Sequence, residues 1–226
     1  MTLSTATVFL LDVDNTLLDN DAVEADLHRH LAAQLGPDRA ERYWTIFEEL
    51  RTELGYADYL GALQRLRGAY PQETGLLEIS AYLIEYPFAG RVFPNALDTV
   101  HRLSELGRTV ILSDGDVVLQ PHKIRRSGVW SAVDGNVLVF VHKERELDAV
   151  EQHYPAEHYV IVDDKLRILD AIKHEWDSRV TTVFLKQGHY ATDVESLKAY
   201  APPDLALERI DELVDALVRA DALGMR

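Results

Sequence analysis

Four short apolar runs, each followed by polar side chains, constrain the fold of this chain more than any other feature of its sequence. They occupy residues 8–11, 110–112, 137–141 and 159–162 and are rich in β-branched and aromatic residues. Runs of this kind, bounded by polar residues, are typical of strands buried in a parallel sheet. From residue 91 onward they alternate with segments of helical periodicity. The alternation predicts an α/β fold with a doubly wound parallel sheet and right-handed crossovers.

The other elements of this sheet domain are expected from the same two periodicities. A short apolar stretch at 205–207 precedes a closing helix that carries Ile210, Leu213 and Leu217. Such helices bury one apolar face against the sheet. Further helices are expected at 94–106, 117–127, 144–153 and 166–176, with a further strand at 180–185.

Residues 17–90 form a block of a different character, with helical periodicity only. Val23, Leu27, Leu31 and Leu35 recur at every fourth position until Gly36, and the period resumes at 43–54, 56–68 and 76–86. Four short amphipathic helices in succession predict a compact helical bundle. The block follows the first strand, so it is inserted at a carboxyl-end loop, where it covers the site as a lid. The sequence thus predicts an α/β core of residues 1–16 and 91–226 and a helical cap of residues 17–90.

Charge and cysteine content exclude several classes of function. The 226 residues include 38 acidic and 23 basic side chains, which gives a formal net charge of −15. A surface this acidic repels a phosphate backbone, so we expect no nucleic acid as a general partner. The chain has no cysteine. Disulfides, thiolate metal sites and cysteine nucleophiles are therefore excluded.

The apolar segments do not predict a targeting or membrane-spanning element. The first apolar stretch runs directly into Asp12 and lacks the anatomy of a signal peptide. No run approaches the roughly 20 apolar residues that a membrane helix needs. We expect a cytoplasmic protein without a membrane partner, and its oligomeric state stays open.

Polar side chains gather where the predicted strands end. In an open parallel sheet, ligands bind outside the carboxyl ends of the strands, so these side chains are expected to face one crevice. Like charges cannot all ionise side by side without a cation, and carboxylate ligands without cysteine favour Mg²⁺. A hydroxyl and an ammonium group suit phosphate oxygens. Together these groups indicate phosphoryl transfer with a carboxylate nucleophile available. The residues concerned are Asp12, Asp14, Ser113, Lys143, Asp163 and Asp164.

These positions resemble the four motifs of the haloacid dehalogenase-like (HAD) hydrolase superfamily. The segment Asp12-Val-Asp-Asn-Thr-Leu17 resembles its signature loop, Ser113 its second motif, Lys143 its third and Asp163-Asp164 its fourth. All four occur in the order of the family, each after a predicted strand. The helical insertion between the first two motifs resembles the first type of cap in the family. The resemblance implies a Rossmann-like HAD core of the phosphatase type.

The resemblance also implies a role for each residue. Asp12 would be the nucleophile that forms an aspartyl-phosphate, and Asp14 would protonate the leaving alcohol and then deprotonate the attacking water. Thr16 would steady the loop, Ser113 would hydrogen-bond the phosphoryl group and Lys143 would neutralise its charge. The implied cofactor is Mg²⁺, held by Asp12, the backbone carbonyl of Asp14, and Asp164, with Asp163 as a direct or water-mediated neighbour. The implied substrate is a small phosphorylated metabolite.

Some positions depart from the family pattern or leave a choice open. Asp114 and Asp116 follow Ser113, where many members have Asn or Gly, and would repel a phosphate unless they turn away or contact the substrate. Either acid of the pair at 163–164 is a candidate for the principal metal ligand. Lys123 and Lys165 are alternative candidates for the catalytic lysine. In the cap, Arg42, Arg51 and Arg65 are candidates to contact a substrate anion.

Three other functions remain open at this stage. A phosphomutase uses the same aspartyl-phosphate but returns the phosphoryl group to its substrate. A haloacid dehalogenase uses a carboxylate nucleophile without the metal cluster or the second acid, so Asp14 argues against it. A binding protein that has kept the fold is a third alternative, although no motif looks disabled. The sequence does not identify the substrate.

Overall fold

A single parallel sheet forms the centre of the molecule. The structure is a computed structural model that describes residues 7–222, so the expected core residues 1–6 and 223–226 lie outside the described part. The strand order is β3-β2-β1-β4-β5-β6, and every neighbouring pair is parallel. The strands are β1 (Thr7–Leu11), β2 (Arg108–Asp114), β3 (Val137–Phe140), β4 (His158–Asp163), β5 (Val180–Leu185) and β6 (Leu205–Leu207).

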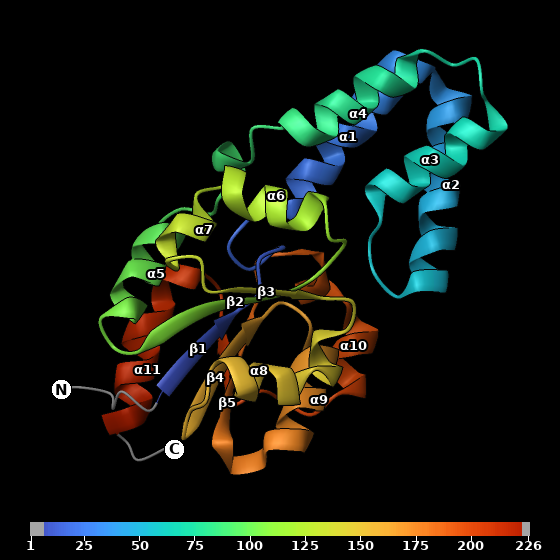
Figure 1. The fold of residues 1–226 in the computed structure, drawn as a ribbon. Helices are drawn as coiled ribbons and strands as arrows, with labels where there is room; N and C mark the ends of the chain where they lie inside the picture. Colours follow the sequence, from blue (N-terminus) through green and yellow to red (C-terminus); the bar gives the residue numbers. More distant parts are fainter. Residues whose placement is uncertain (1–6, 223–226) are drawn as a thin grey trace.

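Successive residues of the central strand enter two different hydrophobic clusters. Phe9 and Leu11 belong to one cluster, and Val8 and Leu10 belong to the other. This alternation follows from the two-residue period of a strand and explains why residues 8–11 of β1 are all apolar. Helices α5 (Ala96–Ser104) and α11 (Leu213–Ala222) supply the first cluster, and α8 (Leu147–His153) and α9 (Leu166–Trp176) the second. The predicted doubly wound α/β fold is confirmed (Figure 1).

The strand order places the ends of three strands side by side. Strand β1 lies between β2 and β4, and the chain moves outward from it in both directions. Such a reversal of strand order opens a crevice at the carboxyl ends. The residues that follow β1, β2 and β4 therefore face the same space.

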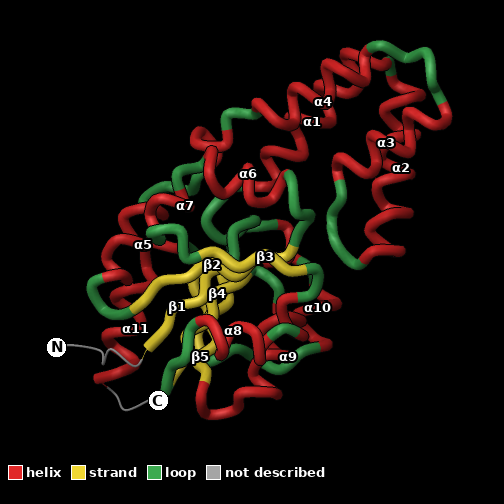
Figure 2. Tube along the Cα trace, in the orientation of Figure 1, coloured by secondary structure: helices red, strands yellow, loops and turns green. Residues whose placement is uncertain are grey.

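Between β1 and α5 the chain forms a helical cap that projects beyond the carboxyl edge of the sheet (Figures 1 and 2). Helix α1 packs on α2 and α4, and α2 packs on α3. The apolar residues spaced by four along α1 are buried, as their period predicts. Gly36, with φ of 80°, is the single residue between α1 and α2. The helices are α1 (Asn20–Leu35), α2 (Pro37–Leu54), α3 (Tyr59–Ala69) and α4 (Gly75–Glu85).

Two antiparallel segments connect the cap with the core. Leu18 and Val92 form an isolated bridge. The Asp19 N–H donates to the carbonyl of Arg91 at 2.8 Å, and the Phe93 N–H donates to that of Leu17 at 2.9 Å. The proposed boundaries of the cap, at residues 17 and 90, lie at these paired segments.

Several elements differ from the sequence-based expectation. Strand β3 is the edge of the sheet, and its residues are half-buried rather than enclosed. Strand β2 continues through Asp114, two positions beyond the expected end at residue 112. Two short helices, α7 (Val129–Ala132) and α10 (Val194–Ala199), were not expected because neither is long enough to show a helical period. No helix within residues 7–222 has the length and hydropathy to cross a membrane.

Candidate active site

Lys143 joins the ends of β1 and β4. Its Nζ lies 2.5 Å from Asp12 Oδ1 and 2.6 Å from Asp163 Oδ2, and it donates to the carbonyl of Leu112 at 3.1 Å. All three charged side chains are buried. Burial alone would lower the pKa of Lys143, but the two carboxylates outweigh it and raise that pKa above its ordinary value. Lys143 is thus a permanent cation beside the predicted nucleophile.

Three buried carboxylates form a group that fits a hard metal ion. Each of Asp12, Asp163 and Asp164 offers an oxygen, and these oxygens lie within 4.8 Å of one another. Asp12 Oδ2 and both Asp164 oxygens accept no hydrogen bond from any described residue. Burial raises the pKa of Asp164 well above its usual range. Unpaired buried carboxylates are costly, and an all-oxygen ligand set of this kind suits Mg²⁺.

The two acids after β4 differ in their partners. Asp163 Oδ1 accepts the Lys165 N–H at 2.8 Å, and its other oxygen faces Lys143. Asp164 has two oxygens without a hydrogen-bond donor among residues 7–222. Asp164 is therefore the better available ligand of the pair.

Asp14 points toward helix α6 (Leu119–Arg126) rather than toward the three-acid group. Its carboxylate oxygens lie 2.7 and 2.9 Å from Lys123 Nζ, and Gln120 Nε2 donates to it at 3.3 Å. Lys123 also donates to Asn20 Oδ1 at 3.0 Å. The resemblance assigns metal binding to the backbone carbonyl of Asp14, not to its side chain. The side-chain contacts therefore do not test that assignment, and it stays a prediction.

Ser113 and the loop after Asp14 are held by hydrogen bonds. Ser113 Oγ accepts from Gln120 Nε2 at 2.9 Å. Asn15 has φ of 57°, and its side-chain oxygen accepts the N–H groups of Asn20 and Asp21 at the start of α1. Thr16 is fully buried and donates its N–H to the Val13 carbonyl at 3.2 Å, whereas its hydroxyl has no partner among the described residues. The backbone of Thr16, rather than its hydroxyl, makes the turn.

The two acids that depart from the family pattern are bound to backbone N–H groups. Asp114 Oδ1 accepts the Lys143 N–H at 2.7 Å. Burial raises the pKa of Asp114, with the Lys143 charge acting against it. Asp116 Oδ1 accepts the N–H groups of Val118 and Leu119, at 2.8 and 2.6 Å, in the turn that leads into α6. These bonds give both acids a structural function.

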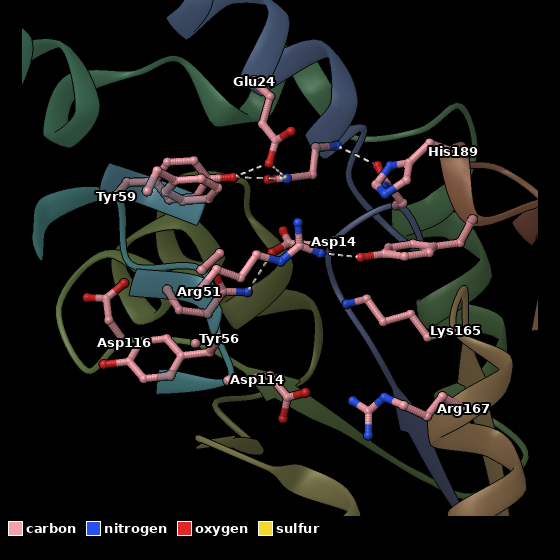
Figure 3. Close-up of a pocket in the computed structure, with 18 of the residues that line it drawn as sticks. Asp14, Glu24, Arg51, Tyr56, Tyr59, Asp114, Asp116, Lys165, Arg167 and His189 are labelled. Atoms are coloured by element: carbon pink, nitrogen blue, oxygen red, sulfur yellow. Dashed lines mark hydrogen bonds between the residues drawn. The ribbon is translucent and has the colours of Figure 1, made fainter. Parts of the chain in front are cut away.

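A cavity of about 390 Å³ separates the site from the cap (Figure 3). Arg51 of α2 reaches across it, and its Nη2 donates to the Tyr190 hydroxyl at 2.5 Å. Arg42 and Arg65 instead pair with Glu49 and Glu53 on the exposed surface. Of the three cap arginines that the sequence offered, Arg51 is the one that lines the cavity. Other residues that line the cavity are Asp14, Tyr56, Tyr59, Lys165 and Arg167.

Sequence reasoning did not find the partners of Asp14. Gln120 and Lys123 are three positions apart on α6, which puts them on one helix face. That spacing could have indicated that the two side chains act together, but it does not show which part of the chain this face of α6 contacts. Tyr190 was missed because it lies after β5 in a 3₁₀ helix (His189–Thr192) that is too short to show a helical period.

The fold of this chain is similar to those of several solved structures, and one of these is also similar in sequence. A protein of Burkholderia xenovorans LB400, described as a haloacid dehalogenase-like hydrolase, is 58% identical with a TM-score of 0.90, over 93% of this chain and 98% of that chain. YfnB of Bacillus subtilis, described as a HAD-hydrolase bound to magnesium, is 22% identical with a TM-score of 0.62, over 93% and 98% of the two chains.

The fold is also that of an enzyme with different chemistry. L-2-haloacid dehalogenase of Xanthobacter autotrophicus is 17% identical with a TM-score of 0.63, over 97% of this chain and 99% of that chain. At this identity the likeness concerns the fold alone. Neither the protein-family models nor the curated proteins contain a match to the sequence.

Proposed function

This chain belongs to the haloacid dehalogenase-like hydrolase family, and on that premise we propose that it is a Mg²⁺-dependent phosphatase. It would hydrolyse a small phosphorylated metabolite, a phosphate monoester, through an aspartyl-phosphate at Asp12. The observation that carries the proposal is the buried group of Asp12, Asp163 and Asp164 beside Lys143, with carboxylate oxygens that no described donor satisfies. A metal-independent hydrolase has no need of these costly groups.

The geometry prepares Asp12 for nucleophilic attack. Lys143 holds Oδ1 at 2.5 Å, while Oδ2 accepts no hydrogen bond from a described residue. The free oxygen would attack phosphorus as the ester P–O bond breaks, which gives an acyl phosphate and an alkoxide. Ser113 would orient the phosphoryl oxygens. Mg²⁺ held by Asp12, Asp164 and the Asp14 carbonyl would neutralise charge on the transferred group.

Asp14 would move the protons of both half-reactions. It lines the cavity, where a leaving group must lie. In the first step its carboxyl proton passes to the departing alkoxide. In the second step its carboxylate takes a proton from the water that attacks the phosphoryl group, which releases inorganic phosphate and restores Asp12.

Two alternatives use the same fold. A haloacid dehalogenase needs the nucleophile but neither Asp14 nor the acidic group, so both features favour the phosphatase. A phosphomutase shares the entire constellation, and its distinction from a phosphatase lies in the fate of the phosphoryl group.

The decisive test is a screen of phosphate monoesters, including p-nitrophenyl phosphate, with Mg²⁺ present. We expect phosphate release that is lost with EDTA and in the isosteric Asp12→Asn variant. No release above that variant would contradict the proposal. Halide release from 2-halo acids without Mg²⁺ would identify a dehalogenase. Dependence on a bisphosphate activator without phosphate release would identify a phosphomutase.

A further inference from the structure

Lys143 is enclosed by groups of the protein. An ammonium group has three N–H bonds. Lys143 Nζ donates to Asp12 Oδ1 and to the Leu112 carbonyl at 2.5 and 3.1 Å, and it lies 2.6 Å from Asp163 Oδ2 as an ion pair. The side chain is only 1% exposed. It is therefore turned toward these protein groups and is not among the residues that line the cavity.

Lys165 is a second cation at the same site, and its donors are free. Its side chain points into the cavity (Figure 3). Within residues 7–222 its Nζ makes no hydrogen bond or ion pair, and its contact is the ring of Tyr190 at 5.4 Å. Lys165 therefore presents to the cavity an ammonium group that has no ion-pair partner among the described residues.

The other cations around the cavity have partners. Arg167 pairs with Glu144 at 2.6 Å. Arg51 donates to Tyr190, and Lys123 is bound to Asp14. Among the described cavity residues, Lys165 is thus the cation best able to donate to an incoming anion.

We infer that Lys165 is a catalytic residue that donates to the oxygens of the transferring phosphoryl group, while Lys143 acts through Asp12 and Asp163. This inference rests on the proposed function. The transferred group spreads negative charge over three oxygens in its transition state, and a fixed cation there lowers the barrier. A lysine supplies a compact point charge suited to phosphate.

The test compares wild type with Lys165→Met and Lys165→Arg, with Mg²⁺ present. Inorganic phosphate binding is measured by calorimetry, and kcat/KM is measured with p-nitrophenyl phosphate. We expect Lys165→Met to weaken phosphate binding at least about tenfold and to lower kcat/KM about 10²–10³-fold. Lys165→Arg should recover part of both. Lys186→Met is the matched control, because Lys186 pairs with Glu208 outside the cavity wall.

Two results would overturn the inference. One is wild-type phosphate affinity and kcat/KM in Lys165→Met. The other is a loss confined to esters with a second anionic group, which would place Lys165 at a distal subsite. A wild-type enzyme that releases no phosphate would contradict the phosphatase itself, and the calorimetric comparison would still test Lys165. A Mg²⁺-induced shift of the thermal midpoint in each variant shows that its site is folded.

Discussion

The ammonium group of Lys123 lies 2.7 and 2.9 Å from the two carboxylate oxygens of Asp14. Lys123 is buried in α6, and its remaining contact is Asn20, the first residue of the cap helix α1. The Asn20 amide donates in turn to the Tyr59 hydroxyl at 3.4 Å. A buried chain of hydrogen bonds therefore connects the predicted acid–base residue with the cap.

The Lys123–Asp14 pair should control both stability and turnover. Removing Lys123 leaves the charge of Asp14 without its partner, but the Asp14 side chain is 26% exposed. Lys123→Met should therefore lose less unfolding free energy than the roughly 3–5 kcal/mol that breaking a fully buried pair costs. The loss should be smaller when Asp14→Asn is already present. A double-mutant cycle by urea unfolding measures this coupling. Additive losses would show that the pair does not act as a unit. Lys173→Met is a control in a half-exposed pair.

The two acids of the first loop should fail in different ways. Asp12→Asn should abolish turnover, because no carboxylate remains to attack phosphorus. Asp14→Asn should cost about 10²–10⁴-fold with an alkyl phosphate, whose alkoxide needs a proton. The first step should suffer less with p-nitrophenyl phosphate, because its phenolate leaves without one. Burst kinetics on both esters would check this. An equal effect of Asp14→Asn on the first step with both would contradict the acid role.

Mg²⁺ should stabilise the folded protein through Asp164. A ligand at about 100 times its dissociation constant adds about 2.7 kcal/mol to the free energy of unfolding. We expect a higher thermal midpoint with Mg²⁺ and its reversal by EDTA. Asp164→Ala should remove most of this response, whereas Asp170→Ala, which alters a carboxylate bonded to the Ala201 N–H, should keep it. Equal responses in both variants would place the metal elsewhere.

An acid at the base of the cap should make stability depend on pH. Asp26 accepts hydrogen bonds from Tyr86 and Arg91, which hold its pKa below the usual range, with Tyr86 the larger cause. Because the folded pKa lies below the unfolded value of about 3.9, the carboxylate stabilises the fold above that pH. This contribution disappears as the pH falls through the lowered pKa.

Asp26→Asn should therefore lose about 1 kcal/mol of unfolding free energy at neutral pH, after allowance for solvent screening. Its difference from wild type should shrink below about pH 4. Urea unfolding across a pH series measures this difference, and Tyr86→Phe should reproduce part of it. A difference that stays constant with pH would contradict the assignment.

The sequence predicted which distant residues lie together in the site better than it predicted which side chain each of them contacts. Asp12, Lys143 and Asp163 contact one another because parallel strands end at the same edge, and that rule needs only the position of each strand. The sequence favoured Lys143 as the catalytic lysine and kept Lys123 and Lys165 as alternatives, without showing what any of the three contacts. Their roles depend on which way α6 and the loop after β4 turn. Likewise, backbone N–H groups bind the carboxylates of Asp114 and Asp116, and a pattern of residue types does not show in which direction a backbone N–H group points.

The central claim, that Asp12 becomes phosphorylated, is tested most directly by trapping the acyl phosphate. The Asp14→Asn variant is mixed with p-nitrophenyl phosphate and Mg²⁺, quenched in acid and treated with borohydride, which reduces an aspartyl-phosphate to homoserine. Peptide mass spectrometry then locates the change. We predict homoserine at position 12, and none in the variant that also carries Asp12→Asn. Phosphate release with an unmodified Asp12 at every quench time would contradict the covalent mechanism.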